Sequence, residues 1–341
     1  MDQNALTETA ARMVAPGKGL LAADESSPTI AKRFDAVGVE STEENRRAYR
    51  NLLFTAPDIE NYISGVILFD ETIRQSASSG EPFPKLLEGR GILPGIKVDK
   101  GAKALAGHAG EKVTEGLDGL RERFAEYYKL GARFSKWRAV IAIEAQEGLP
   151  SDACIAVNAH ALARYAALAQ EAGIVPIVEP EVLIDGAHTQ GQCESASART
   201  LAAVFDELDA QGVLLEGMVL KPSMVIAGKK CPEQSPVAEV AEATLRTLRR
   251  HVPAATAGIA FLSGGQTPEQ ATAHLDAMNR AGPLPWPLTF SYARALQNPV
   301  LDRWRGEKKN AETAAAAFSE RARLNHLARR GEYDASMERA A

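Results

Sequence analysis

The stretch LLEGMVLKPSM, residues 214–224, contains the feature that organises the interpretation of the whole chain. Its apolar run lies between Gly212 and Pro222, which predicts a buried strand of a parallel sheet. Lys221 ends this run, directly before a proline that cannot donate a ladder hydrogen bond. A buried ammonium group without a partner is costly, so two interpretations are open. Either the side chain extends along apolar surface into water, or Lys221 is an amine of lowered pKa that forms a Schiff base with a carbonyl substrate.

Length and composition limit the classes of protein to consider. A chain of 341 residues with 45% hydrophobic residues is long enough for one α/β barrel with modest extensions. Its net charge of -5 leaves no broad basic surface, so we expect no nucleic-acid partner and anions bound only at a local site. No signal peptide or long uncharged apolar span is evident, so we expect a cytoplasmic protein with no membrane partner. Cys154, Cys193 and Cys231 are odd in number and widely spaced, which argues against a disulfide framework.

Short apolar segments alternate with helical patterns along the chain. The predicted strands are residues 19–26, 63–70, 94–100, 132–140, 174–182, 213–222, 258–265 and 287–293. The predicted helices are residues 7–14, 42–53, 117–130, 153–172, 237–250, 269–280 and 310–330. Ser41 and Glu44 have the S-x-x-E spacing of a capping box for the helix that follows, and Thr267 with Pro268 is a second start signal.

This alternation predicts an α/β fold, a single (β/α)8 TIM barrel. We expect one domain over residues 1–341, with a barrel core at about 19–305, an N-terminal helix, and a C-terminal helix plus short tail in 306–341. The alternative is a doubly wound open sheet. That fold would favour a glycine-rich turn after the first strand, where this chain has Asp-Glu-Ser-Ser-Pro instead.

Charged and hydroxyl residues lie near the ends of the predicted strands. They are spaced two residues apart, so both members of a pair point to the same face. They are Asp24 and Ser26, Lys97 and Asp99, Lys136 and Arg138, Glu179 and Glu181, and Lys221. At one end of a barrel, these residues would share the mouth where active sites of this fold lie. A cation at Lys136 near Lys221, together with partial desolvation, would favour the neutral amine of Lys221.

Two groups of residues are candidates for binding phosphate. Ser263, Gly264 and Gly265 follow the seventh strand just before a capped helix, and Ser291 and Arg294 follow the eighth. Loops after these two strands are the usual phosphate seat of such barrels. A second group combines Ser26, Thr29, Arg33, Lys97 and Arg138. Together they predict a small substrate phosphorylated at both ends.

The histidines give no sign of a metal site. His108, His160, His188, His251, His274 and His326 form no H-x-x-x-H or similar ligand spacing. We therefore expect no metal and no other cofactor.

The motifs taken together resemble those of the class I fructose-bisphosphate aldolases. They are LAADES (21–26), GVILF (65–69), GIKVDKG (95–101), KWR (136–138), IVPIVEPE (174–181), LEGMVLKP (215–222), FLSGGQ (261–266) and FSYARALQ (290–297). The resemblance spans nearly the whole chain. It implies reversible, metal-independent cleavage of fructose 1,6-bisphosphate to dihydroxyacetone phosphate and glyceraldehyde 3-phosphate, in glycolysis and gluconeogenesis, by a cytoplasmic homotetramer.

The resemblance also assigns roles to the residues at the strand ends. Lys221 would attack the C2 ketone, Glu179 would shuttle protons, and Asp24 would take the C4 hydroxyl proton. Lys136 would assist by its charge and Glu181 by hydrogen bonding to the two lysines. Following the family, the C1 phosphate would contact Ser263, Gly264, Ser291 and Arg294. The far phosphate would contact Ser26, Thr29, Arg33, Lys97 and Arg138.

Two features differ from the family pattern. Ala293 stands where the family usually has glycine, which would cost affinity if that backbone needs a positive φ or close approach to phosphate. The sequence stops at Ala341 without the terminal tyrosine that animal members use in enamine protonation, so we expect slower proton exchange at C3 of the triose.

Two other functions remain open. One is an aldolase or transaldolase-like enzyme on another phosphosugar, such as tagatose bisphosphate, and the other is a non-catalytic scaffold that retains the barrel.

Overall fold

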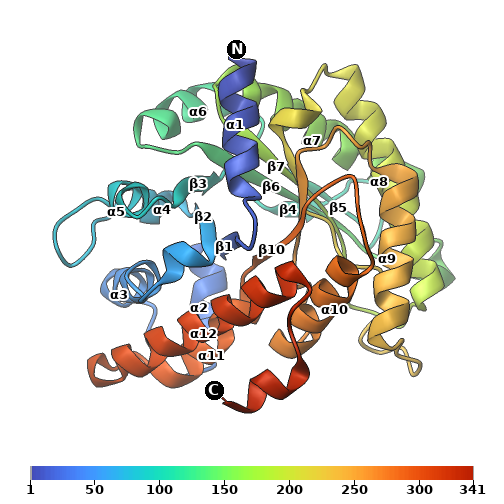
Figure 1. The fold of residues 1–341 in the computed structure, drawn as a ribbon. Helices are drawn as coiled ribbons and strands as arrows, with labels where there is room; N and C mark the ends of the chain where they lie inside the picture. The colour runs from blue at the N-terminus through green and yellow to red at the C-terminus, as the bar shows by residue number, and fades with distance from the viewer. Residues whose placement is uncertain (1, 341) are drawn as a thin grey trace.

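A closed barrel of eight parallel strands forms the centre of the molecule (Figure 1). The computed structural model describes the backbone of residues 2–340 and the side chains of residues 2–338. Around the barrel the strand order is β1-β10-β9-β8-β7-β6-β3-β2. The strands are β1 (Gly19–Ala23), β2 (Ile63–Leu68), β3 (Leu93–Lys97), β6 (Phe134–Ile141), β7 (Val175–Val182), β8 (Val219–Leu220), β9 (Gly258–Phe261) and β10 (Leu288–Tyr292). The predicted (β/α)8 fold is confirmed.

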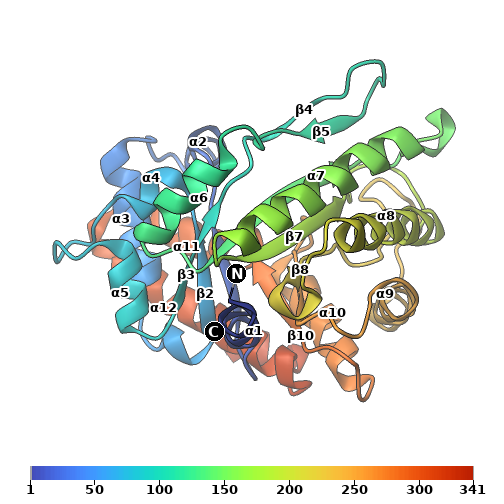
Figure 2. The same cartoon turned by 90° about the horizontal axis from the view of Figure 1, so that it is seen from above.

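Helices surround this barrel (Figure 2). They are α2 (Ser27–Asp35), α3 (Glu43–Phe54), α4 (Asp70–Ile73), α5 (Phe83–Gly89), α6 (Leu120–Lys129), α7 (Asp152–Glu171), α8 (Gln190–Ala210), α9 (Val237–His251), α10 (Pro268–Arg280), α11 (Arg294–Trp304) and α12 (Ala311–Arg330). A hairpin of β4 (Ala102–Ala104) and β5 (Lys112–Thr114) extends beyond the barrel. Short 3-10 turns are η1 (Ile59–Asn61), η2 (Ala145–Glu147), η3 (Leu215–Gly217), η4 (Lys308–Asn310) and η5 (Ala335–Ala340).

The N-terminal helix α1 (Gln3–Met13) closes the end of the barrel at which the strands begin. Its buried residues Leu6, Ala10 and Met13 belong to the same apolar cluster as Phe134 inside the barrel. The Phe134 ring fills the space beside Gly95, where an added Cβ would lie 2.3 Å from it. Because this end is filled, only the carboxyl ends of the strands are free to hold a polar cavity.

The segment that opened the sequence analysis differs from its prediction. Only Val219–Leu220 is a strand, and Leu215–Gly217 is a 3-10 turn. The amide side chain of Gln170 on α7 takes the place of a strand neighbour: its nitrogen donates to the Leu214 and Gly217 carbonyls at 2.8 and 3.1 Å, and its oxygen accepts from the Leu214 N–H at 2.9 Å. The backbone is thus satisfied without a ladder, and the prediction of a long strand was wrong.

Helix starts were predicted with mixed success. The cap of α10 is confirmed as a capping box of Thr267 and Gln270, with Pro268 in the first turn. The predicted box of Ser41 and Glu44 is wrong, because Thr42 is the cap of α3 and its hydroxyl accepts from the Asn45 N–H.

Helices α2, α4, α5, α8 and α11 were not predicted from the sequence. Helix α8 has a capping box of Thr189 and Gln192 that gave a usable start signal. Helix α11 contains Pro299, a residue that argues against a helix when only the sequence is read.

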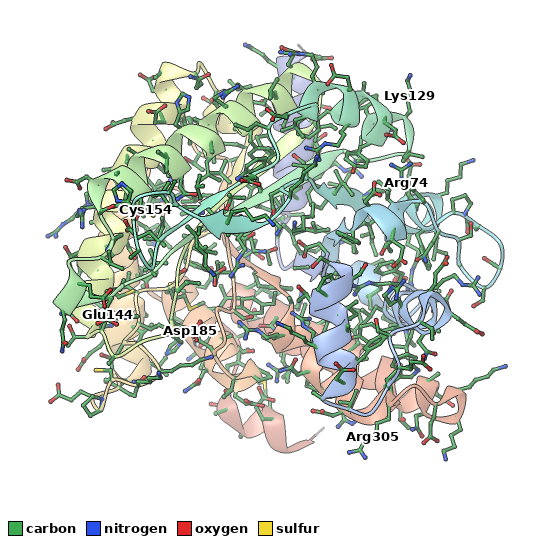
Figure 3. The ribbon with its side chains drawn as sticks, turned by 180° about the vertical axis from the view of Figure 1, so that it is seen from behind. Arg74, Lys129, Glu144, Cys154, Asp185 and Arg305 are labelled. Carbon is green, nitrogen blue, oxygen red and sulfur yellow. The ribbon has the colours of Figure 1, made fainter. Side chains whose placement is uncertain are left out.

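The three cysteines are unpaired and buried, and Cys154 lies near the start of α7 (Figure 3). Burial, and after it the charge of Glu111, raises the pKa of Cys154 to about 11. This thiol is therefore protonated at neutral pH. Among the described helices, none is both long and apolar enough to cross a membrane.

Candidate active site

A polar cavity of about 620 Å³ lies at the carboxyl ends of the barrel strands. It is lined by every predicted site residue except Gly265, namely Asp24, Ser26, Thr29, Arg33, Lys97, Lys136, Arg138, Glu179, Glu181, Lys221, Ser263, Gly264, Ser291 and Arg294. Segments far apart in the sequence therefore contribute to one site. The cavity also contacts residues that the sequence analysis did not select, among them Glu25, Lys32 and Leu262.

Lys221 lies directly after β8 and is only 3% exposed. Its backbone N–H donates to the Val178 carbonyl at 2.8 Å, which continues the pairing with β7. Its Nζ lies 3.1 Å from Oε1 of Glu179. The interpretation in which this lysine extends into water is wrong, because the ammonium group is buried against a carboxylate inside the cavity.

Glu179 lies between two buried amines. Its Oε1 faces Lys221, and its Oε2 lies 3.3 Å from Nζ of Lys136. The Oε2 contact is an ion pair without hydrogen-bond geometry, so this buried oxygen has no hydrogen-bond donor. A carboxylate with an unused lone pair beside an amine is well placed to receive a proton.

Asp24 and Lys136 form the second half of this cluster, with Oδ2 and Nζ 2.7 Å apart. Burial alone would raise the pKa of Asp24, but Lys136 and Lys221 outweigh it and hold that pKa well below its usual range. Burial alone would lower the pKa of Lys136, but Asp24, Glu179 and Asp99 outweigh it and raise that pKa. Asp24 is therefore a carboxylate and Lys136 a cation at neutral pH.

The resulting chain runs Asp24, Lys136, Glu179, Lys221, with acids and amines in alternation. Lys136 and Lys221 both contact Glu179, which lies between their Nζ atoms. Each acid contacts an amine at 3.3 Å or less, so a proton can move between neighbours with little change in geometry.

The cations predicted for the far phosphate are each paired with an acid of the protein. Lys97 Nζ lies 2.6 Å from Asp99 Oδ1, and Arg138 forms an ion pair with Glu181. In the part of the chain that the structure describes, Glu181 therefore accepts from Arg138 and from neither lysine. The predicted hydrogen bond from Glu181 to the lysine pair is wrong.

Arg33 is paired with Glu25, a buried acid that the sequence analysis missed. Glu25 is 3% exposed at its side chain and also accepts from Arg50 at 2.6 Å and from the Gln297 amide at 2.8 Å. Burial would raise the pKa of Glu25, but Arg33 and Arg50 outweigh it and lower that pKa. Glu25 was missed because the period-two pairing of Asp24 and Ser26 assigned the residue between them to the opposite face, whereas β1 ends at Ala23 and all three residues line the cavity.

The loops after β9 and β10 form the other side of the cavity. Gly264 and Gly265 have φ of 56° and 87°, values that favour glycine, and the turn leads into the capped N-terminus of α10. The hydroxyl of Ser291 is buried without a hydrogen-bond partner. Ala293 has φ of -103°, so the backbone at this position does not need a positive φ.

Arg294 faces the cavity, and no carboxylate of the described residues lies within ion-pair distance of it. Burial and then the guanidinium groups of Arg33 and Arg138 lower the pKa of Arg294, and they outweigh the carboxylates of Glu181 and Asp185, which act in the opposite direction. A cation in this situation is stabilised when an anion binds.

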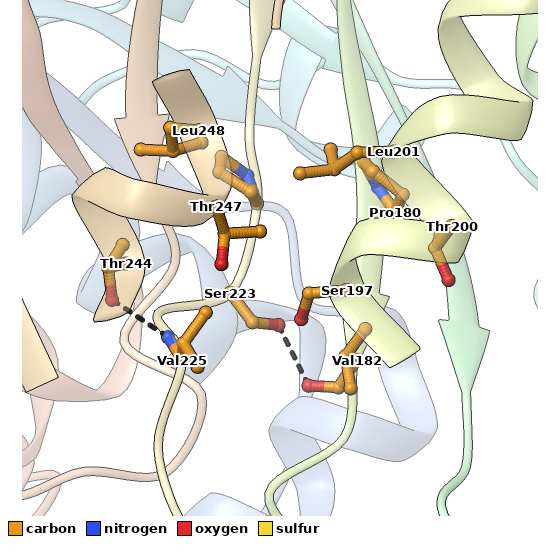
Figure 4. A pocket seen from close by; sticks show the side chains of 11 residues that line it. Pro180, Val182, Ser197, Thr200, Leu201, Ser223, Val225, Thr244, Thr247 and Leu248 are labelled. Carbon is orange, nitrogen blue, oxygen red and sulfur yellow. Dashed lines mark hydrogen bonds between the residues drawn. The ribbon is translucent and has the colours of Figure 1, made fainter. Parts of the chain in front are cut away.

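Other parts of the molecule offer less chemistry. Among the described residues, no group of three or more His, Cys, Asp or Glu side chains is arranged to hold a metal ion. A cavity of about 10 Å³ lies between α8 and α9, where Ser223 Oγ donates to the Val182 carbonyl and the Val225 N–H donates to Thr244 (Figure 4). It is lined mostly by apolar and hydroxyl groups and is too small for a sugar phosphate.

Comparisons with known proteins give matches over nearly the whole chain. The family model described as fructose-bisphosphate aldolase class-I matches residues 5–341. A probable fructose-bisphosphate aldolase class 1 of Xanthomonas campestris is 59% identical over 96% of this chain and 98% of that protein. Fructose-bisphosphate aldolase C of Pan troglodytes is 52% identical over 98% of this chain and 92% of its own length.

A solved structure of fructose-bisphosphate aldolase from Plasmodium falciparum has the same fold. It superposes with a TM-score of 0.96 at 49% sequence identity, and the match covers 97% of this chain and 95% of that one.

Proposed function

The chain belongs to the class I fructose-bisphosphate aldolase family and is a carbon–carbon lyase, and from this premise we propose that Lys221 is its Schiff-base residue. The observation that supports this most strongly is the buried Lys221 amine, 3.1 Å from Glu179 and within the cavity that also contains the glycine turn and Arg294. A phosphate bound at that turn would bring a nearby ketone to the amine.

In the first stage, neutral Lys221 attacks C2 of fructose 1,6-bisphosphate after Glu179 accepts its proton. A bond forms between Nζ and C2. The ketone oxygen becomes a hydroxyl and then leaves as water, with Glu179 returning a proton to it. The product is an iminium ion, which is the electron sink for the next stage.

In the second stage, Asp24 takes the proton of the C4 hydroxyl. The C3–C4 bond breaks, glyceraldehyde 3-phosphate is released, and the bonding electrons form an enamine on Lys221. Because its pKa is lowered, Asp24 enters this step ionised, and the cation of Lys136 lies between the two acids. Protonation of the enamine and addition of water then release dihydroxyacetone phosphate.

The phosphates would occupy opposite sides of the cavity. We propose that the C1 phosphate binds at Ser263, Gly264, Gly265, Ser291 and Arg294. The far phosphate would bind at Ser26, Thr29, Arg33, Lys97 and Arg138, whose cations keep their acid partners. We propose no metal in this reaction, so cleavage should continue after exhaustive chelation.

Trapping the intermediate tests the assignment directly. Borohydride added with dihydroxyacetone phosphate should reduce the iminium and attach the triose to the peptide that contains Lys221. The Lys221→Met variant should not be labelled and should lose at least about 10⁴-fold in kcat, because covalent catalysis ends. Label on another lysine would overturn the assignment. Product analysis with tagatose 1,6-bisphosphate and with transaldolase donors would detect a different phosphosugar preference.

The setting of the enzyme is proposed from family resemblance. We propose one domain over the whole chain, a homotetramer, and a role in cytoplasmic glycolysis and gluconeogenesis. Light scattering of the purified protein would give the oligomeric state, and limited proteolysis would reveal any separately folded part.

A further inference from the structure

A second lysine, Lys229, lies close to the glycine turn of the cavity. A Cβ added to Gly265 would be 2.6 Å from Nζ of Lys229 and 3.3 Å from Nη2 of Arg294. The two cations, from the segments after β8 and β10, therefore meet over the backbone that leads into α10. Gly265 has no side chain to separate them from that backbone.

The position of Lys229 is fixed by its own loop. The N–H groups of Gly228, Lys229 and Lys230 donate to the carbonyls of His188, Ile184 and Gly186 at 2.8, 2.9 and 2.9 Å. An added Cβ at Gly228 would lie 2.4 Å from the Gly186 carbonyl oxygen, so only glycine permits this close approach. These three hydrogen bonds form a clamp that holds the Lys229 backbone against the loop after β7, and the Lys229 side chain reaches Gly265.

The charge of Lys229 is only weakly offset. The nearest carboxylate of the described residues is Asp185, with Oδ1 3.9 Å from Nζ and a side chain that is 76% exposed (Figure 3). Such an exposed pair is worth little. Arg294, the other cation above Gly265, has no ion-pair partner in the described part of the chain. Two cations and a turn of backbone donors in one place would be stabilised by an anion with two negative charges.

We propose that Lys229 is a binding residue for the substrate's C1 phosphate and acts together with Arg294. This inference rests on the proposed function for the orientation of the sugar, but not for the presence of the anion site. Lys229 is 44% exposed at its side chain and does not line the cavity itself; its Nζ lies beside Gly265, the neighbour of the lining residue Gly264. We expect Lys229 to strengthen phosphate binding, whereas the reacting carbons are contacted by the buried cluster of Asp24, Lys136, Glu179 and Lys221.

The chain provides a matched control. Lys230 is the next residue, is also exposed, and lies in the same clamped loop. Lys229→Met and Lys230→Met remove the same charge and leave the same backbone hydrogen bonds. Equilibrium dialysis with inorganic phosphate should show about tenfold weaker binding for Lys229→Met and less than twofold change for Lys230→Met, as expected for loss of one charge-assisted contact. Equal binding by the two variants would overturn the proposal.

A second measurement separates this proposal from the Schiff-base assignment. In borohydride trapping, Lys229→Met should need about tenfold more dihydroxyacetone phosphate for half-maximal labelling, yet reach the same plateau on Lys221. A lower plateau with an unchanged half-maximal concentration would contradict a binding role for Lys229. If the wild type is not labelled on Lys221, the proposed function fails, while the dialysis result still decides whether Lys229 binds phosphate.

Asp185 allows a test in the opposite direction. Asp185→Asn removes the carboxylate that competes for Lys229 and should tighten phosphate binding about twofold. The gain should vanish in the double variant with Lys229→Met. A gain that persists without Lys229 would show that Asp185 affects phosphate binding only through long-range electrostatic repulsion. That result would count against the proposal.

Discussion

The two sides of the cavity hold similar cations in different electrostatic states. On the side of β1, β3 and β6, the cations Arg33, Lys97 and Arg138 are each bound to an acid of the protein. On the side of β9 and β10, Arg294 has no ion-pair partner among the described residues, and Lys229 has only the exposed carboxylate of Asp185 at 3.9 Å; both cations lie near Gly265. We infer that the first set stabilises the fold as well as binding substrate, whereas the second set is free to bind an anion.

The largest expected effect tests the role of the paired cations in folding. Glu25→Gln removes the charge that holds Arg33 and Arg50, and leaves Arg50, which is 3% exposed, without a counter-ion. Loss of one partner from a buried pair is strongly destabilising, so we expect a loss of about 3 kcal/mol in the free energy of unfolding, measured with denaturant. A loss below about 1 kcal/mol would mean that these pairs contribute little to the fold.

The same variant should change how stability depends on pH. The pKa of Glu25 is lowered from 4.5 in the folded state, so its contribution is fully present above about pH 4.5 and is lost as the pH falls toward the folded-state pKa. The difference in unfolding free energy between wild type and Glu25→Gln should therefore shrink in acid. A constant difference from pH 7 to pH 3 would indicate that packing, and not charge, carries the effect.

The next largest effect concerns Arg294, on the side of the cavity formed by the loops after β9 and β10. Arg294→Met should raise KM for fructose 1,6-bisphosphate by about 30-fold because a charged hydrogen-bond donor to phosphate is lost. Its unfolding free energy should change by less than about 0.5 kcal/mol, since no ion pair of the described residues is broken. Steady-state kinetics and denaturant unfolding on the same samples would provide both values.

Arg33→Met is the matched variant on the opposite side. Because Glu25 already offsets the charge of Arg33, we expect a smaller rise in KM, about threefold, with a measurable loss of stability. If Arg33→Met raised KM as much as Arg294→Met and left stability unchanged, the contrast between the two sides would be wrong.

The position of the site was predictable because barrel geometry limits where strand ends can lie. Polar residues two apart at the ends of apolar runs must share one face, and parallel strands bring those faces to one mouth. This reasoning placed the pairs Lys136 and Arg138, and Glu179 and Glu181, at the mouth from their spacing, whereas Lys221 was selected as the lysine that ends an apolar run. The catalytic roles assigned to them remain predictions.

The partners of these residues were not predictable from spacing. Glu25 binds Arg50 across 25 positions of sequence, and Gln170 replaces a strand ladder at Leu214 across 44. Lys229 meets Arg294 only because the segments after β8 and β10 both approach Gly265. Each of these contacts joins elements through side-chain geometry, which no local period or capping signal encodes.

The smallest expected effect concerns Ala293, where the family usually has glycine. Its φ of -103° lies outside the left-handed region that favours glycine, and its carbonyl accepts from the N–H groups of Leu296 and Gln297 at 3.1 and 2.9 Å, which fixes the start of α11. Glycine is therefore not required by the backbone, and Ala293→Gly should change KM by less than about twofold, with kcat unchanged. A fall in KM of fivefold or more would show instead that the methyl group obstructs phosphate on the β10 side. The unpaired cations would then be partly blocked in the natural sequence, and Arg294→Met should be compared again in the Ala293→Gly background, where its effect on KM would have to increase.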